Sequence, residues 1–223
     1  MKLNIVYTTE PVEYKKAHKM QMNFHEQRAA GEIPDTLWLL EHTPVITVGI
    51  RKNQETNILV NPADFGVDVV ETERGGEVTY HGPGQIVGYI FAGMENHSFK
   101  VRRFVERLEE SFISFLKDEH NISARHDPEH TGVWVGMDKI TAIGIAIKKR
   151  VTFHGFAFNV NTNLEHFSWI VPCGINDRGV TSLQKLKGRS FDILETGRTL
   201  SEHIRKELGY EAEGDFREIS VSG

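Results

Sequence analysis

The stretch that decides the fold reads Arg74-Gly75-Gly76-Glu77-Val78-Thr79-Tyr80-His81-Gly82-Pro83-Gly84-Gln85. It holds four glycines and a proline, and the apolar run Ile86-Val87-Gly88-Tyr89-Ile90-Phe91 follows directly. Dense glycine beside a strand indicates backbone that passes very close to another group. A phosphate-binding loop is excluded, because no Gly-Lys-Ser/Thr follows and no helix opens behind the glycines. An ordinary polar turn is the alternative.

This string resembles the signature of the octanoyltransferases of lipoate biosynthesis. Other blocks agree with the same family in chain order: Leu37-Trp38-Leu39-Leu40-Glu41-His42 with Pro44-Val45, Lys139-Ile140 with Ala142-Ile143-Gly144, Phe153-His154-Gly155-Phe156-Ala157 with Asn159-Val160, and Pro172-Cys173-Gly174-Ile175 with Val180-Thr181-Ser182-Leu183. The likeness covers about residues 35–185. It implies an α+β fold of the biotin/lipoate protein ligase type, a mostly antiparallel or mixed sheet with helices packed against it.

Length and composition are those of a soluble globular protein. The chain has 223 residues, of which 39% are hydrophobic and 26% charged, so we expect one catalytic domain spanning residues 1–223. The net charge is −5, without a long run of one sign, which gives no indication of a nucleic-acid or membrane partner. No secretory signal and no apolar stretch of about 18 residues is visible, so a cytoplasmic location is expected.

Hydrophobic periodicity predicts the main elements. We expect strands over residues 3–7, 37–40, 45–49, 67–70 and 86–91, a loop over 50–66 and strand pieces over 133–140. Three helices are expected: one from Pro11 with Gly31 as its cap, an amphipathic one over 100–119 with Ser98 as N-cap, and a last one that buries Leu200, Ile204 and Leu208 and stops at Gly209. A hairpin is expected over about 140–160, with the basic tip Lys148-Lys149-Arg150. Mixed strands and few helices in one uninterrupted chain predict a single α+β domain.

The segment 120–132 carries His120, His126 and His130, together with Asp127 and Glu129. A metal site is one interpretation. Their spacing fits no usual zinc pattern on a defined element, so a solvated polar loop is the favoured interpretation.

Cys173 is the only cysteine, which excludes an internal disulfide. Buried structural cysteines usually sit in periodic apolar runs, whereas this one lies between Pro172 and Gly174 in a segment without such a period. Loop placement favours a reactive thiol over an inert one. A free thiol has a pKa of about 8.5, so a neighbouring base or cation must activate it, and the signature blocks offer Lys139, His81 and His154.

Lys139 follows a tight turn and precedes the apolar residues Ile140 and Ile143. It is either an ordinary surface lysine or one whose ammonium form is disfavoured by desolvation. A neutral lysine would accept the Cys173 proton, and a charged one would stabilise the thiolate. The family resemblance implies that Cys173 and Lys139 form the catalytic dyad.

The resemblance also implies the reaction and its partners. An octanoyl group would pass from octanoyl–acyl carrier protein to Cys173 as a thioester, and then to a lysine of a lipoyl domain, on a 2-oxoacid dehydrogenase acyltransferase subunit or the glycine cleavage H protein. No cofactor is expected, since the acyl group arrives activated. The glycine stretch would line the path of the acyl tail, and backbone amides of residues 142–144 or 155–157 would bind the oxyanion.

The residues implied to bind substrate are Arg74, Gly75, Gly76, Glu77, Val78, Thr79, Tyr80, His81, Ala142, Ile143, Gly144, Gly155, Phe156 and Ala157, with His42 and His154 in supporting roles.

Three other functions are alternatives for this sequence. An ATP-dependent lipoate or biotin ligase would share the fold but needs no nucleophilic cysteine. A non-catalytic acyl or lipoyl-domain binding module would need no thiol beside a lysine. A zinc site made by Cys173, His81 and His154 has a weak signal, because a lone cysteine with isolated histidines fits no zinc spacing, and no metal is expected.

Overall fold

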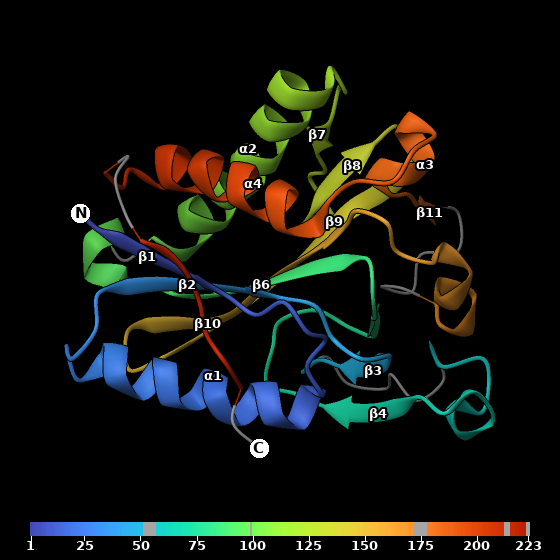
Figure 1. Cartoon of the computed structure of the whole chain (residues 1–223), viewed down its shortest axis with the longest axis horizontal. Helices are drawn as coiled ribbons and strands as arrows, with labels where there is room; N and C mark the ends of the chain where they lie inside the picture. The colour runs from blue at the N-terminus through green and yellow to red at the C-terminus, as the bar shows by residue number, and fades with distance from the viewer. Residues whose placement is uncertain (51–56, 99, 172–177, 212–214, 222–223) are drawn as a thin grey trace.

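The structure is a computed structural model that describes the chain except at residues 51–56, 99, 172–177, 212–214 and 222–223 (Figure 1). Its centre is a nine-stranded mixed sheet in the order β12-β1-β2-β6-β10-β9-β8-β7, with β11 paired to β9. The strands are β1 (Leu3–Tyr7), β2 (Asp35–Leu40), β6 (Gln85–Phe91), β7 (Arg125–His126), β8 (Val133–Val135), β9 (Asp138–Lys148), β10 (Val151–Asn159), β11 (Gly179–Val180) and β12 (Phe216–Glu218).

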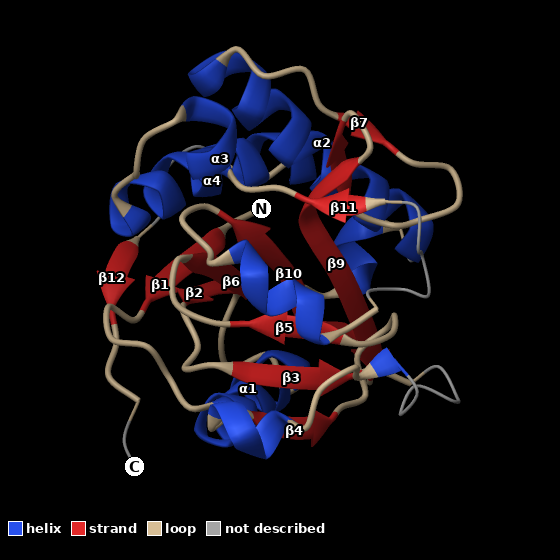
Figure 2. Cartoon of the chain, turned by 90° about the vertical axis from the view of Figure 1, so that its right-hand side faces the viewer, coloured by secondary structure: helices blue, strands red, loops and turns tan. Residues whose placement is uncertain are grey.

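A second, three-stranded sheet in the order β4-β3-β5 lies beside the main one (Figure 2). It is made by β3 (Val45–Val48), β4 (Asp68–Glu71) and β5 (Thr79–His81). The signature stretch therefore joins the two sheets, since it enters from β4, forms β5 and runs on into β6.

Helices cover both faces of the main sheet (Figure 1). On one face, α2 (Val101–His120) and α4 (Ile193–Leu208) pack against each other over a large apolar cluster that includes Phe112, Phe156 and Ile204. On the other face, α1 (Tyr14–Ala29) covers a smaller cluster around Trp38. The remaining helical segments are short: η2 (Pro62–Phe65), η3 (Met94–His97), η4 (Leu164–Trp169) and α3 (Leu183–Lys187).

This architecture confirms the predicted α+β fold, the β9–β10 hairpin with its basic tip and the last helix with Gly209 as its cap. The segment expected to be loop contains the short helix η2. The Ser98 cap was wrong: Lys100 is the N-cap of α2, and Ser98 instead ends η3 in a left-handed conformation.

The spacing of Ala17, Met20 and Phe24 in the sequence predicts that these residues form the buried face of helix α1, and the structure buries a different face. Its fully buried residues are Tyr14, Ala17, Gln21 and His25, and Met20 and Phe24 are only partly buried. A polar stripe with helical spacing thus faces the sheet, which brings hydrogen-bonding side chains beside β10. Among the described residues, no helix has the length and apolar character needed to cross a membrane.

Candidate active site

A cavity of about 1080 Å³ opens between the signature stretch, β9, β10 and the start of α2. Its lining includes nearly all residues predicted to bind substrate: Arg74, Gly75, Gly76, Glu77, Val78, Thr79, His81, Ala142, Ile143, Gly144, Gly155, Phe156 and Ala157. Lys139 and His154 also line it. Tyr80 and His42 do not: Tyr80 packs into a separate apolar cluster with Phe167, and His42 is fully buried.

Arg74 fixes the wall of this cavity. Its guanidinium donates to Thr47 Oγ1 at 3.0 and 3.1 Å, to the Thr47 carbonyl at 2.8 Å and to the Glu77 carbonyl at 2.5 Å. These bonds tie the loop of residues 74–77 to β3 in the small sheet. The described contacts of Arg74 thus hold the backbone in place, a role that its residue type alone did not indicate.

Glycines let this loop press against the main sheet. A Cβ atom on Gly144 would lie 2.7 Å from the Gly75 carbonyl oxygen, and one on Gly75 would lie 3.2 Å from the Ile145 carbonyl oxygen. The predicted close approach is thus protein backbone against protein backbone. Gly82 and Gly84 do not line the cavity; the first lies against the Tyr80 ring and the second against the Asn161 backbone.

Replacing Gly144 with alanine is expected to push the loop of residues 74–77 away from β9, because a contact of 2.7 Å with a backbone oxygen cannot be kept. We expect unfolding free energy to fall by about 1–3 kcal/mol and KM for the acyl donor to rise. In Gly75→Ala the new methyl group would lie 3.2 Å from the Ile145 carbonyl oxygen, so both the fall in unfolding free energy and the rise in KM should be smaller. Thermal unfolding and steady-state kinetics measure both, and equal effects in the two variants would contradict this account.

A chain of buried polar groups runs from His81 toward Lys139. His81 Nδ1 lies 2.7 Å from Gln85 Oε1, and the Gln85 amide donates to Asn159 Oδ1 at 2.9 Å. The Asn159 amide in turn donates to the Thr181 carbonyl at 3.1 Å, and the Thr181 N–H donates to the Lys139 carbonyl at 3.0 Å. Burial, with nearby His42 and Arg74, holds the pKa of His81 well below its usual value. His81 is therefore neutral, and its described contacts give it a positioning role.

Lys139 stands at the start of β9 and is half-buried. Its Nζ atom donates to the Thr131 carbonyl at 3.1 Å and lies 4.8 Å from the centre of the Trp134 ring. Both groups favour the ammonium form, because a carbonyl accepts its hydrogen bond and the ring face attracts a cation.

Cys173, predicted as the nucleophile, lies outside the described residues, but the chain on both sides of it is placed. The Val171 N–H donates to the Asn57 carbonyl at 2.8 Å. Downstream, Arg178 lies over the Trp134 ring at 5.1 Å, and Val180 pairs with Lys139 in the β11–β9 ladder. The chain from Arg178 to Val180 is therefore held beside Trp134 and Lys139.

The two histidines predicted as supports differ in surroundings. His42 is buried between the Val12 carbonyl, 2.8 Å from Nδ1, and the Tyr89 hydroxyl, 2.7 Å from Nε2, and burial lowers its pKa to about 4. His154 borders the cavity on β10 with a left-handed backbone, φ 57°, that a non-glycine residue rarely adopts. Burial, His18 and Arg74 lower the pKa of His154 to about 3, so it is neutral.

The two sets of backbone amides proposed for the oxyanion are not equivalent. Strand β10 lies between β6 and β9, so the N–H groups of residues 155–157 are taken up by the two ladders. N–H groups engaged in this way are less suited to bind an oxyanion. On β9, the pairing with β8 ends at Thr141, and the edge of residues 142–144 faces the cavity without a strand partner among the described residues. This edge remains the candidate.

Sequence reasoning missed several residues at the site. Tyr14 and Tyr89 line the cavity, and Thr47 receives the Arg74 bonds. The polar stripe on α1 was the available signal for Tyr14 and its neighbours. The histidines of segment 120–132 do not converge on a metal site in the described part of the chain; His126 lies between Glu109 and Glu110, at 2.9 and 2.7 Å.

The lipoyl protein ligase A/B catalytic domain matches residues 13–205. A curated octanoyltransferase of Caldicellulosiruptor saccharolyticus is 53% identical over 99% of this chain and 93% of that protein. One of Desulforamulus reducens is 44% identical over 96% of this chain and 94% of that protein.

Solved structures agree on the fold. A lipoate-protein ligase A bound with ATP superposes with a TM-score of 0.72 at 15% identity, over 97% of this chain and 89% of the other. A biotin protein ligase of Aquifex aeolicus gives 0.58 at 15% identity, over 92% and 70%. With its cavity built from the signature stretch, the chain belongs to the lipoyl protein ligase A/B catalytic domain family, and within it to the octanoyltransferases, which are enzymes of acyl transfer.

Proposed function

We propose that this protein transfers an octanoyl group from octanoyl–acyl carrier protein to the target lysine of a lipoyl domain, through a thioester on Cys173. The observation that carries the proposal is the cavity itself: the signature stretch forms its wall, Lys139 lines it, and Gly179 and Val180 pair with the strand of Lys139. Cys173 precedes Arg178 by five residues, which span at most about 17 Å, so a thiol that reaches Lys139 is compatible with the placed chain.

The chemistry needs two steps. Cys173 Sγ attacks the carbonyl carbon of the donor thioester, the carbon–sulfur bond to the carrier breaks, and the carrier thiolate takes up a proton. The amine of the acceptor lysine then attacks the new thioester, the bond to Cys173 breaks, and an amide forms while the amine proton passes to the dyad. In this proposal, Lys139 holds the proton or stabilises the Cys173 thiolate.

The cavity suits an aliphatic chain. Val78, Val87, Ile143, Ile145 and Phe156 contribute apolar side chains to its lining. Burying a methylene contributes about 0.8 kcal/mol, so the tail of an octanoyl group would contribute roughly 5 kcal/mol at full burial. This binding energy comes from the acyl group, which is the part that donor and acyl-enzyme share.

Intact-mass measurement tests the proposal. After incubation with octanoyl–acyl carrier protein and without ATP, we expect an increment of about 126 Da on the chain, as the octanoyl group replaces the thiol hydrogen. The adduct should disappear with neutral hydroxylamine, which cleaves thioesters, and on addition of a lipoyl domain. Absence of the adduct in an active preparation would contradict the covalent route.

The same measurement separates the alternatives. An ATP-dependent ligase would transfer free octanoate only with ATP present, whereas a thioester donor arrives already activated. A binding module would neither form the adduct nor label rapidly with iodoacetamide at Cys173.

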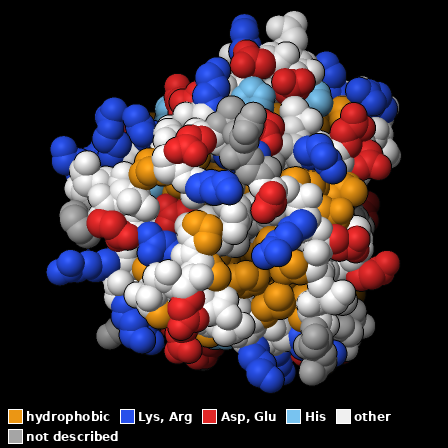
Figure 3. All heavy atoms as spheres, turned by 60° about the vertical axis from the view of Figure 1, so that its left-hand side comes forward, with side chains coloured by type: hydrophobic (Ala, Val, Ile, Leu, Met, Phe, Trp, Pro, Cys, Tyr) orange, Lys and Arg blue, Asp and Glu red, His pale blue; other side chains and the backbone are white. Residues whose placement is uncertain are grey.

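Lipoyl-domain proteins are the expected acceptor partners. We expect both the acyl carrier donor and the lipoyl-domain acceptor to dock on basic residues of this chain. On the face in Figure 3, Lys and Arg side chains stand among Asp and Glu without a continuous field of one sign. The basic cluster Lys148-Lys149-Arg150 lies at the far end of β9, nine residues and about 30 Å from Lys139. Arg102 and Arg103, on the first turn of α2, line the cavity. A third basic cluster of the sequence, Arg51-Lys52, lies outside the described residues.

Reversing Arg102 and Arg103 to glutamate is expected to raise KM for the acyl carrier donor about tenfold and to flatten its salt dependence, because both charges stand at the cavity. The matched control reverses Lys148, Lys149 and Arg150 at the remote tip. Steady-state rates at several salt concentrations compare the two. A larger effect of the tip variant would place the docking surface on the hairpin instead.

A further inference from the structure

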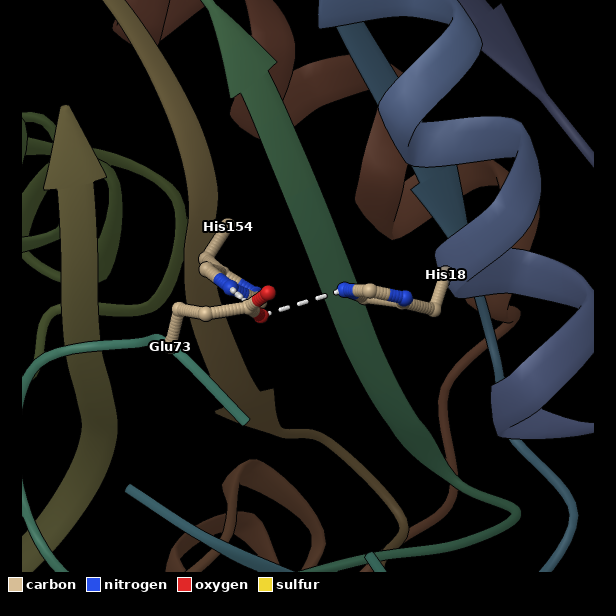
Figure 4. A group of neighbouring side chains, drawn as sticks. All are labelled: His18, Glu73 and His154. Atoms are coloured by element: carbon tan, nitrogen blue, oxygen red, sulfur yellow. Dashed lines mark hydrogen bonds and ion pairs between the residues drawn. The ribbon is translucent and has the colours of Figure 1, made fainter. Parts of the chain in front are cut away.

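His18, Glu73 and His154 meet at one point, although they come from α1, the loop after β4 and β10 (Figure 4). His18 Nε2 lies 3.2 Å from Glu73 Oε2, and His154 Nε2 lies 3.9 Å from the same oxygen. One ligand atom from each residue lies within 4.8 Å of the other two. The two imidazole rings face each other with centroids 6.1 Å apart.

The buried member of the group needs an explanation. His154 is only 2% exposed, and neither of its ring nitrogens has a hydrogen-bond partner among the described residues. Buried polar atoms of this kind are rare, because each forfeits its hydrogen bonds to water. The backbone N–H of His154 is satisfied, since it donates to Gln21 Oε1 at 2.6 Å. Only the ring is left without a partner, and its Nε2 is the atom that approaches Glu73.

We propose that His18, Glu73 and His154 bind a divalent transition-metal ion, with Zn²⁺ as the ion that the site fits best. Two imidazole nitrogens and one carboxylate oxygen form a three-ligand set that zinc accepts, with a fourth position for water. Ligands 2.0–2.2 Å from a tetrahedral ion lie about 3.3–3.6 Å apart. The two separations that involve Glu73, 3.2 and 3.9 Å, are within a few tenths of an ångström of that spacing, and the two histidine nitrogens lie within 4.8 Å of each other. The 31% exposed His18 side chain and the 62% exposed Glu73 side chain would both move inward to complete the site around the fixed His154.

The charge and protonation of the group favour a cation. His154 is neutral in its buried position, which is the form in which imidazole binds a metal. Glu73 supplies the one negative charge. Arg74 is the neighbouring cation that opposes a metal, and its guanidinium is directed to Thr47 and the Glu77 carbonyl.

The position of the site decides what the metal would do. His154 pairs with Ile145 on β9, six residues and about 20 Å from Lys139, so the ion is remote from the proposed base. Glu73 precedes Arg74, the first residue of the cavity wall. A metal here would fasten the start of that wall to α1 and β10, in addition to the anchor that Arg74 makes on β3. It is thus a structural metal that fixes the cavity.

Metal titration of the tag-free, chelator-treated protein tests this. We expect one Zn²⁺ per chain by calorimetry, and Co²⁺ as a probe should give the visible absorption of a four-coordinate site. At a Zn²⁺ concentration of about 100 Kd, the midpoint of thermal unfolding should rise by about 5–10 °C. The Cys173→Ser protein should bind equally, which excludes the thiol as a ligand.

His18→Gln and Glu73→Gln change side chains that are partly or largely exposed, so both proteins should fold. Each is expected to weaken Zn²⁺ binding at least about tenfold, and His154→Asn should do the same while keeping a residue that tolerates a left-handed backbone. Glu71→Gln, two residues away and exposed, is the matched control and should bind like the parent. Absence of saturable binding, or unchanged affinity in the His18→Gln/Glu73→Gln double variant, would overturn the proposal. Neither result depends on acyl transfer.

Discussion

Cys173→Ser is expected to abolish octanoyl transfer, with kcat/KM falling by about 10³-fold or more. A serine hydroxyl is far harder to ionise than a thiol, so the groups that suffice to activate Cys173 would leave the serine protonated. Transfer from octanoyl–acyl carrier protein to a lipoyl domain, followed by mass spectrometry of the acceptor, measures the loss.

Folding should hardly change in this variant, because the substitution replaces one atom of similar size. An unchanged thermal midpoint is therefore the control. Transfer by the serine variant at the rate of the parent protein would rule out the thioester and favour direct attack by the acceptor lysine on the donor.

Lys139→Ala is expected to lose about 10²–10⁴-fold in transfer, the range typical of a positioned acid–base group. Lys139→Arg should also lose most of its transfer activity, since guanidinium does not give up a proton and the acceptor amine must lose one. The arginine variant keeps a cation beside Trp134 and the Thr131 carbonyl, so its Cys173 should still react with iodoacetamide below neutral pH.

Alkylation and transfer together separate the two roles of Lys139. If the arginine variant both alkylates and transfers like the parent protein, only a positive charge is needed at this position. That result would agree with the Trp134 ring and the Thr131 carbonyl, which favour the ammonium form of Lys139. If the alanine variant alkylates and transfers like the parent, Lys139 is an ordinary lysine, and His81 or His154 must be tested as the base.

Much of the fold could be predicted because its signals are local. The spacing of Phe104, Leu108 and Phe112 is enough to define α2, and Gly209 is enough to end α4. Helix α1 was misjudged in part, since its burial depends on hydrogen bonds such as that of Gln21 to the His154 N–H, which joins residues far apart in sequence. Hydrophobic periodicity carries no information about such a bond.

The candidate site shows the same division. A family signature predicted which residues line the cavity, and the structure places nearly all of them there. It could not predict that Gly75 meets Gly144, or that His18 meets His154, because each pair joins elements whose distance is decided by packing of the whole sheet. The thiol of Cys173 stays a prediction from sequence, as its position lies outside the described residues.

The cavity wall made by residues 74–77 is attached to both sheets. Arg74 hydrogen-bonds to β3 of the small sheet, and Gly75 packs against β9 of the large sheet. The width of the cavity therefore depends on how firmly the two sheets are held together. If their packing is rigid, the cavity admits acyl chains of one width, and if the packing yields, it admits several. Substitutions at Thr47 or elsewhere in β3 can therefore change the selectivity for the acyl chain, although these residues do not contact the substrate.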